Sequence, residues 1–465
     1  MKKKAPIKSA DYRMSNHTSP RSVALQILKE VNKDGSFANI SLKENLRKYS
    51  FDTRDVAFIS RLAYGTLEKQ YTIDSILDKL ANMKKVNFWI RDILRMGAYQ
   101  ILYMDKVPDS AACNEAVKLS KVHGFSGLQG FVNGTLRNIS RRKEELLTPD
   151  NNLSISEKLS LKYSFPIWLT EKWIKDYGPE TTEAIMKPME LENGVSIRVN
   201  TNRISITDLK GKLQESGAIV QDGFHMEEAL RVSGIGDMEK NQLYREGLFT
   251  VQGESSMLDT YIINPQAGEM VLDSCSSPGG KAIHMAEHMG GKGQVIAWDI
   301  HAHRLDLIKL NAERMKSEII EPMLMDASVL HTQWKDKFDR VLIDAPCSGL
   351  GTIHKKPDIK LNITPEDLEE LPALQGKILD ACSYYVKPGG VLVYSTCTVN
   401  LEENQNVIKG FLEKHPEFKL DDPTPYVPDS VKNAIINGMI QLIPSLHQVD
   451  GFFITRMRRE TFINE

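Results

Sequence analysis

The stretch Phe338-Asp-Arg-Val-Leu-Ile-Asp-Ala-Pro-Cys-Ser-Gly349 is an apolar run that ends in an aspartate, a proline and a cysteine. A second stretch, Gly390-Val-Leu-Val-Tyr-Ser-Thr-Cys-Thr398, has the same character and leads to Cys397. We expect both runs to be buried strands of a parallel sheet. Side chains that follow such strands lie at the carboxyl edge of the sheet, where α/β folds bind ligands. Two thiols at this edge, Cys347 and Cys397, suggest covalent chemistry on an electron-poor carbon.

The turn Asp273-Ser-Cys-Ser-Ser-Pro-Gly-Gly-Lys281 follows a third predicted strand, Met270–Asp273, and leads into a helix from Ala282 to Met289. Its small residues and paired glycines let a ligand approach the backbone closely. The dinucleotide fingerprint Gly-x-Gly-x-x-Gly is absent, and Lys281 is not followed by the Ser or Thr of a P-loop. A nucleoside cofactor without phosphates fits this turn better, and S-adenosylmethionine is the natural candidate.

Aspartates end four successive predicted strands of this region. Asp273 ends the first, Asp299 follows the strand 293–298, Asp326 follows Met323-Leu-Met325, and Asp344 ends the fourth. An acidic residue at the tip of the adjacent strand binds ribose hydroxyls in nucleotide sites. One such aspartate would be an ordinary turn or helix-cap residue, whereas four in series predict a cofactor crevice.

The first third of the chain has a different pattern. From Ser19 to about Arg142 the apolar residues recur with a helical period, which predicts an all-α domain with Ser19 as N-cap and Pro20 in the first turn. Residues 1–145 carry 26 Lys and Arg against 15 Asp and Glu, a net charge of +11, and residues 1–18 read as a basic flexible tail. The remainder carries 33 against 46, a net charge of −13. A basic domain of this kind suits a polyanion, although a solvated helical surface explains the same charges.

The remaining segments suggest two further parts. Residues 146–250 read as a linker and a small α+β module, with strands at 195–200 and 218–220 and a helix at 206–216 between them. From residue 251 to 465 strands and helices alternate, as in a doubly wound α/β domain. The chain ends in a predicted antiparallel hairpin, for which Asp450-Gly451 suits the tight turn.

Composition narrows the class of protein. The 465 residues are 41% hydrophobic, and no apolar run is long enough to cross a bilayer. Five cysteines without a Cys-x-x-Cys pair argue against a disulfide framework or a structural zinc site, so we expect a cytoplasmic protein. Cys113, Cys275 and Cys382 read as structural. The histidines show no metal-ligand spacing with acidic partners, so no metal is expected; they include His123, His284, His288, His331 and His447.

The turn at 273–281 and the two cysteine motifs at 344–351 and 394–398 together resemble the RNA cytosine-C5 methyltransferase family. The helical residues 19–142 look like the RNA-binding domain of the NusB-type antitermination factors. This combination resembles the bacterial 16S rRNA methyltransferases of that family over nearly the whole chain. The resemblance implies a Rossmann-like methyltransferase domain at 251–465, the small α+β module at 146–250, and a NusB-like domain at 19–145.

The resemblance also implies roles for the motif residues. Cys397 would attack C6 of cytosine, Asp344 would hydrogen-bond the base near N3, and Cys347 would assist loss of the C5 proton and release of the enzyme. A free thiol is largely protonated at neutral pH, so the site must lower the pKa of its nucleophile, for which Lys281 is a candidate. The cytosine must also leave any stack to be reached.

For the cofactor, S-adenosylmethionine, the resemblance implies that Asp299 binds the ribose and Asp326 the adenine amino group. The turn would hold the methionine end, and Asp344 borders the same crevice. The turn residues are Cys275, Ser276, Ser277, Pro278, Gly279, Gly280 and Lys281. Gly253 and Leu361 stand where the family usually has Asp and Trp, and we expect them to alter how RNA or the rim of the site is held.

The catalytic motifs do not encode the RNA. The helical domain favours 16S rRNA, and the family would imply cytosine 967 as the target. We expect the protein to be a monomer. A tRNA cytosine-C5 methyltransferase is the alternative with the same chemistry. A non-catalytic RNA-binding or antitermination factor would not need Cys397, Cys347 and Asp344. An amino-group methyltransferase would want Asp or Asn-Pro-Pro-aromatic after the fourth strand, where this chain has Asp-Ala-Pro-Cys.

Overall fold

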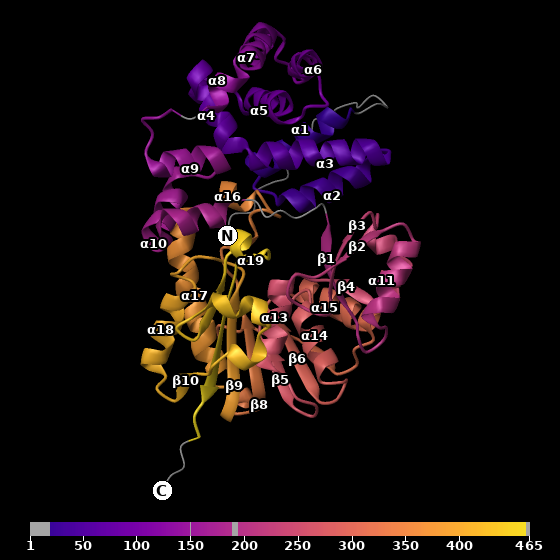
Figure 1. The fold of residues 1–465 in the computed structure, drawn as a ribbon, viewed down its shortest axis with the longest axis vertical. Coiled ribbons are helices and arrows are strands. Elements are labelled where there is room, and N and C mark those ends of the chain that lie inside the picture. The colour runs from indigo at the N-terminus through magenta and orange to yellow at the C-terminus, as the bar shows by residue number, and fades with distance from the viewer. Residues whose placement is uncertain (1–18, 149, 188–193, 462–465) are drawn as a thin grey trace, which may run out of the picture. The chain divides into compact units, whose positions relative to one another are not determined.

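The computed structural model describes residues 19–148, 150–187 and 194–461. The chain forms two compact units, Met1–Lys175 with Lys356–Asn362, and Asp176–Lys355 with Ile363–Glu465 (Figure 1). The basic tail expected at residues 1–18 lies outside the described residues.

All regular secondary structure in the described part of the first unit is helical, as the sequence predicts. Ser19 caps the first helix, because its hydroxyl accepts a hydrogen bond from the Ser22 backbone N–H at 3.2 Å. The helices are α1 (Pro20–Asn32), α2 (Ala38–Lys48), α3 (Thr53–Glu68), α4 (Gln70–Leu80), α5 (Phe88–Tyr103), α6 (Asp109–Val122), α7 (Gln129–Arg141), α8 (Lys143–Leu147), α9 (Ile155–Tyr163), the first part of α10 (Ile167–Met186) and α16 (Ile359–Asn362). The apolar faces of α1 to α8 share one core, which includes Val23, Leu28, Leu62, Ile93 and Leu136.

The short segment Lys356–Asn362, which follows the Cys347 motif in sequence, belongs to this helical unit. The Lys360 ammonium donates to the Glu68 carbonyl at 2.8 Å, and the Tyr71 hydroxyl donates to the Lys360 carbonyl at 3.1 Å. Burial lowers the pKa of Lys360 to about 7. Leu361 packs against the helical core. We expected Leu361 to affect the rim of the site or the RNA, but its described contacts are with this core.

The second unit begins with the small α+β module. Four antiparallel strands lie in the order β2-β3-β1-β4, and α11 (Ile206–Glu215) packs on them through Leu209 and Leu213. The strands are β1 (Val195–Val199), β2 (Ile219–Asp222), β3 (Ala229–Ser233) and β4 (Phe249–Val251). Before them, α10 is broken at Gly178, which has a φ of +78° and precedes Pro179, and it continues to Met186.

The large sheet has the order β11-β12-β13-β9-β8-β5-β6-β7. The parallel strands are β5 (Met270–Asp273), β6 (Gln294–Asp299), β7 (Ile320–Leu324), β8 (Phe338–Asp344) and β9 (Val386–Thr396). The antiparallel strands are β11 (Ile435–Ile436), β12 (Met439–Leu442) and β13 (Phe452–Arg459), and β10 (Phe418–Leu420) also pairs with β13. Strand order reverses between β5 and β8, which is where α/β folds open a ligand crevice.

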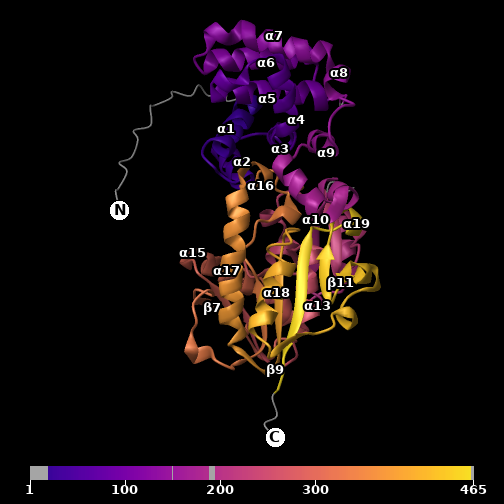
Figure 2. The same ribbon diagram turned by 90° about the vertical axis from the view of Figure 1, so that its left-hand side faces the viewer.

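Helices cover both faces of this sheet, because successive strand residues point to opposite sides (Figures 1 and 2). One face packs against α13 (Glu254–Ile263), α14 (Gly280–His288) and α15 (Ala302–Met315), through strand residues such as Val271, Val295, Leu342 and Val393. The other packs against α17 (Pro365–Ser383) and α18 (Gln405–Lys414), through Leu272, Ile296, Val341 and Leu392. Both faces are buried, which explains the continuous apolar runs of the sequence.

The expected antiparallel hairpin at the end of the chain is present, but its tight turn is not. Residues 443–451, with α19 (Pro444–His447) among them, connect β12 to β13. Asp450 instead lies within 3.1 Å of His354 and 2.7 Å of Lys355. Gly451 donates its N–H to the Gly351 carbonyl at 2.9 Å, and a Cβ on Gly351 would come within 1.9 Å of the Gly451 carbonyl oxygen. Gly451 therefore allows close backbone contact with the loop that follows Cys347.

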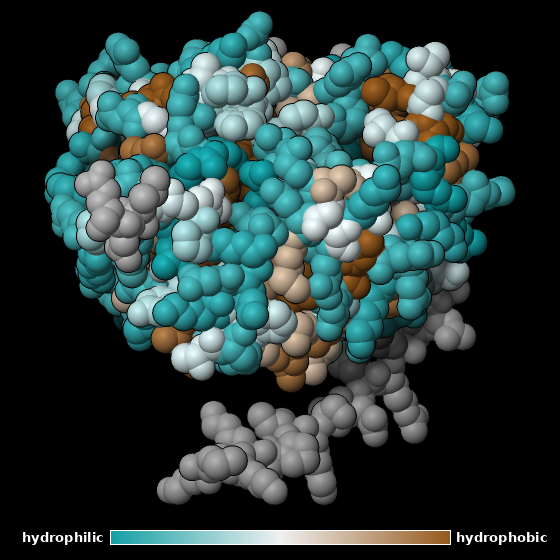
Figure 3. Space-filling model, turned by 90° about the horizontal axis from the view of Figure 1, so that it is seen from below, coloured by the Kyte–Doolittle hydropathy of each residue, from teal (hydrophilic) through white to brown (hydrophobic). Residues whose placement is uncertain are grey.

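The face shown in Figure 3 is mostly hydrophilic, with small separate hydrophobic areas. Among the helices of the described residues, none is both long and apolar enough to span a membrane.

Candidate active site

Strands β8 and β9 bring the two motif cysteines together. These strands are parallel neighbours, with Asp344 paired to Ser395, so the loops after them share one edge of the sheet. The Sγ atoms of Cys347 and Cys397 lie 3.3 Å apart; neither residue forms a disulfide, and both are partly exposed. Gly351 closes the arrangement by donating its N–H to the Cys397 carbonyl at 3.0 Å. The structure thus joins two motifs that are far apart in sequence.

The two thiols are not equivalent. The hydrogen bond to Cys397, followed by burial, raises the pKa of Cys347 well above its usual value. Cys347 therefore stays protonated at neutral pH, and its S–H can be donated to the sulfur of Cys397. A donated hydrogen bond stabilises the thiolate form of its acceptor, which is the form that attacks carbon. The geometry favours Cys397 as the nucleophile of the pair.

Glu403 ties both cysteine loops together, and sequence reasoning did not identify it. Its carboxylate is fully buried and accepts from the Ser348 backbone N–H at 2.8 Å, the Gln375 amide at 3.0 Å and the Asn400 amide at 3.1 Å. The Ser348 hydroxyl donates to it as well. Ser348 adjoins Cys347, and Asn400 lies three residues after Cys397. A buried carboxylate that accepts this many hydrogen bonds fixes the groups that donate them.

Replacing Glu403 with glutamine is expected to lower kcat by about tenfold to a hundredfold, because the amide cannot accept from every donor and the cysteine loops shift. The free energy of unfolding should fall by about 1–3 kcal/mol for the unpaired buried groups. Methyl-transfer kinetics and urea unfolding measure the two effects. Glu402→Gln is the matched control, because that neighbouring side chain is exposed and its one described partner is Asn406. Equal kcat in the two variants would show that Glu403 does not position the cysteine loops.

Lys281 and two carboxylates lie beside the thiols at the same edge of the sheet. The Lys281 ammonium pairs with Asp344 at the tip of β8, and lies 3.3 Å from Asp259 of α13. Although burial opposes charge, Asp344 and Asp259 raise the pKa of Lys281 above its usual value. Burial raises the pKa of Asp259 to about 7. We expected Lys281 to lower the pKa of a thiol, but both of its described ion pairs are with carboxylates, so its direct effect is on Asp344.

The cofactor side of the edge is formed by the turn after β5. Gly279 has a φ of +95°, and the Ser276 backbone N–H donates to the Trp298 carbonyl at 2.8 Å, which holds the turn against β6. Asp273 is buried, and neither of its carboxylate oxygens has a hydrogen-bond partner among the described residues. Burial raises the pKa of Asp273 to about 7. A buried carboxylate left unpaired at a strand tip is suited to a ligand that brings hydrogen-bond donors.

The other two strand-tip aspartates lie along the same edge. Asp299 ends β6, accepts from the His301 backbone N–H at 2.8 Å, and lies 3.8 Å from the Arg304 guanidinium. Asp326 lies two residues beyond β7, and one of its oxygens accepts from the backbone N–H of Ser328 at 2.9 Å. The Ser328 hydroxyl donates to the same oxygen at 2.6 Å. All four predicted aspartates therefore lie at the carboxyl ends of neighbouring parallel strands.

Cys275, Cys113 and Cys382 have the burial of structural cysteines. Cys113 and Cys382 are buried, and burial raises the pKa of Cys382 to about 12. Burial also raises the pKa of Cys275 well above its usual value, although this residue forms part of the cofactor turn. A thiol with a high pKa is a poor nucleophile at neutral pH.

Three family models match the chain. Residues 260–458 match the 16S rRNA methyltransferase RsmB/F family, residues 18–141 match the NusB family, and residues 165–239 match the ferredoxin-like domain of RsmF/B-like methyltransferases. These matches confirm the predicted fold class, in which a NusB-like domain and a small α+β module precede the methyltransferase domain.

Relatives match over nearly the full length. The chain is 36% identical to a probable ribosomal RNA small subunit methyltransferase B from Bacillus subtilis (strain 168), over 95% of this chain and 99% of the relative. It is 31% identical to ribosomal RNA small subunit methyltransferase B from Shewanella oneidensis, with the same two coverages. The crystal structure of PH0851 covers 96% of this chain and 99% of its own, at 26% identity and a TM-score of 0.79. A methyltransferase homologue from Pyrococcus horikoshii covers 66% of this chain at 27% identity and a TM-score of 0.55. The chain is a methyltransferase and belongs to the 16S rRNA methyltransferase RsmB/F family.

Proposed function

We propose that this protein transfers a methyl group from S-adenosylmethionine to C5 of one cytosine in 16S rRNA, through a covalent bond between Cys397 and C6. The family resemblance implies cytosine 967 as the target. The observation that carries this proposal is the 3.3 Å separation of the Cys347 and Cys397 sulfurs at the cofactor edge of the sheet. Cytosine C5 is a poor nucleophile, and it gains enamine character only when a nucleophile adds to C6.

The residues present fit S-adenosylmethionine, which supplies the methyl group when bound. Asp273 has two buried carboxylate oxygens without a hydrogen-bond donor among the described residues. We assign the methionine end of the cofactor to the backbone of Cys275 to Lys281. We assign the ribose hydroxyls to Asp299 and the adenine amino group to Asp326. Asp344 borders the crevice and is paired with Lys281. It would hydrogen-bond the base near N3 and stabilise the charge that develops there as Cys397 adds.

Proton transfer can be divided between the two thiols. We assign the S–H of Cys347 as the donor to Cys397 in the resting site, and the hydrogen bond between the two thiols is the main cause of the raised pKa of Cys347. When Cys397 forms its bond to C6, its sulfur loses its negative charge, and the main cause of the raised pKa is removed. Cys347 can then lose its proton to the surroundings and accept the C5 proton after methyl transfer. Loss of that proton restores the C5–C6 double bond and expels Cys397 as a thiolate.

The helical unit is proposed to bind the RNA. Residues 1–145 carry the net charge of +11, and the phosphate backbone is the polyanion that such a surface attracts. The two thiols, the cofactor turn and the helical unit belong to one chain, so a monomer suffices for the proposed reaction. An rRNA substrate places it in the cytoplasm.

The proposal is tested with labelled S-adenosylmethionine and a bare 16S rRNA transcript, followed by bisulfite sequencing of the product. We expect one cytosine that resists conversion, and none when Cys397→Ala replaces the wild-type enzyme. Labelling of tRNA alone would support the proposed chemistry but contradict 16S rRNA as the substrate. No transfer to any RNA would overturn the enzymatic proposal and favour a binding factor.

A further inference from the structure

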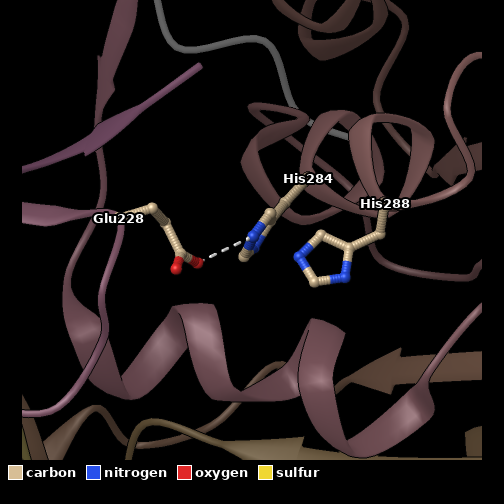
Figure 4. Close-up of side chains that lie close together, drawn as sticks. All are labelled: Glu228, His284 and His288. Carbon is tan, nitrogen blue, oxygen red and sulfur yellow. Dashed lines mark ion pairs between the residues drawn. The ribbon is translucent and has the colours of Figure 1, made fainter. Parts of the chain in front are cut away.

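Three side chains with metal-binding groups converge at a place that the proposed methyl transfer does not use. His284 and His288 lie four residues apart on α14 and therefore share one face of the helix. Glu228, the residue before β3 of the small α+β module, points at them (Figure 4). One ligand atom from each residue can be chosen so that all three lie within 4.8 Å of one another. His spacing of this kind on a helix, completed by a carboxylate from elsewhere, is a common zinc arrangement.

The carboxylate of Glu228 is already oriented for a ligand. The Tyr261 hydroxyl donates to its Oε2 at 2.6 Å, and its Oε1 lies 3.2 Å from Nε2 of His284. Glu228 is 7% exposed and His284 is 1% exposed. Nδ1 of His284 has no hydrogen-bond partner among the described residues. The hydrogen bond from Tyr261 to one carboxylate oxygen leaves the other oxygen for a metal, and such outer-sphere support is typical of metal sites.

The charges around the cluster are compatible with a bound cation. Arg198 lines the same cavity as the cluster, and it is engaged by an ion pair with Glu287 and a hydrogen bond to Gln252 at 2.7 Å. Because Glu287 balances Arg198, the charge of Glu228 remains for a ligand.

Solvent can reach the cluster. A cavity of about 420 Å³ is lined by Glu228, His284 and His288, and by Tyr261 and Asn202 among others. His288 is exposed, whereas Glu228 and His284 are buried. The cavity therefore offers an entry path and space for a water molecule as a further ligand.

We propose that Glu228, His284 and His288 bind one divalent transition metal of the zinc type, with water as the fourth ligand. Two imidazoles and one carboxylate are ligands that Zn²⁺ accepts in tetrahedral geometry, whereas Mg²⁺ and Ca²⁺ prefer oxygen ligands alone. The metal would link the small α+β module to α14, whose first residue, Gly280, belongs to the cofactor turn. Lys281, near the first residue of α14, is the residue that pairs with Asp344.

The test is titration of the purified, metal-free full-length protein with Zn²⁺ against a chromophoric chelator, and with Co²⁺ followed by visible absorption. We expect one tight site per chain, tetrahedral Co²⁺ bands, and a melting temperature that Zn²⁺ raises. His288→Gln should weaken Zn²⁺ binding at least about tenfold and abolish the rise in melting temperature. This side chain is exposed, so the variant should fold, which circular dichroism checks. Tyr261→Phe should weaken Zn²⁺ binding less, because it removes only the hydrogen bond that orients the Glu228 carboxylate.

His303→Gln is the matched control, because His303 is an exposed histidine beside another one, His301, and could bind metal adventitiously. It should leave Zn²⁺ affinity unchanged. Binding that is lost in His303→Gln and kept in His288→Gln would overturn the proposal. Absence of a stoichiometric site at micromolar Zn²⁺ would overturn it as well.

Discussion

Cys397→Ala is expected to abolish methyl transfer, with a fall in kcat of at least about a thousandfold. Without the thiolate no bond forms at C6, and C5 stays too poor a nucleophile to accept a methyl group. Binding of S-adenosylmethionine should be unchanged, because the variant leaves the turn after β5 and the four strand-tip aspartates intact. Filter-bound radioactivity measures transfer, and calorimetry measures cofactor binding. Transfer within tenfold of the wild type would show that Cys397 is not the nucleophile.

Cys347→Ala is expected to have a different effect, which is accumulation of protein covalently bound to RNA. Cys397 still adds to C6 and C5 still takes the methyl group, but the group that removes the C5 proton is missing, so elimination stalls. The adduct should appear, when RNA and S-adenosylmethionine are both present, as a band that resists denaturing electrophoresis. Turnover should fall to the level of a single methyl group per enzyme.

The double variant Cys347→Ala with Cys397→Ala is the control for this trapping, and it should show no adduct. If the covalent adduct accumulated in Cys397→Ala and not in Cys347→Ala, the two thiols would have the opposite roles. The hydrogen bond between them at 3.3 Å also predicts that Cys347→Ala attacks more slowly, because the thiolate of Cys397 loses its donor. Rapid quenching of the first turnover measures this rate.

Much of the catalytic edge could be predicted because parallel strands impose a simple rule. An apolar run marks a strand buried on both faces, and the residues after it lie at the carboxyl edge of the sheet. This rule places Asp273, Asp299, Asp344 and the two cysteines correctly from local sequence. Asp326 lies two residues beyond the end of β7, a strand that is exposed in part.

What the sequence did not show depends on pairing between distant segments. Asp259 reaches Lys281 from α13, and Glu403 reaches both cysteine loops from the segment before α18. No local sequence pattern marks either residue as buried, because a single acidic residue usually faces solvent. Glu228 meets His284 in the same way, because the small module folds back on α14. The helical spacing of His284 and His288 was a signal for this cluster, but its acidic partner could not be found by spacing.

Asp450-Gly451 shows a further limit of local reasoning. The pair is common in tight hairpin turns, and on that ground the turn was expected there. In the structure Asp450 pairs with Lys355 and His354, and Gly451 contacts the backbone of Gly351. Glycine is required at this place for close packing with the loop after Cys347, which no sequence pattern distinguishes from a turn.

The most direct test of the central claim is reaction of the wild-type enzyme with S-adenosylmethionine and 16S rRNA that contains 5-fluorocytidine. Fluorine at C5 cannot leave as a proton, so the methylated adduct cannot eliminate and remains on the nucleophile. After nuclease and protease digestion, mass spectrometry identifies the modified peptide. The account predicts one methylated fluorocytidine nucleotide on Cys397. A nucleotide on Cys347, or no adduct while methyl transfer to ordinary 16S rRNA proceeds, would contradict it.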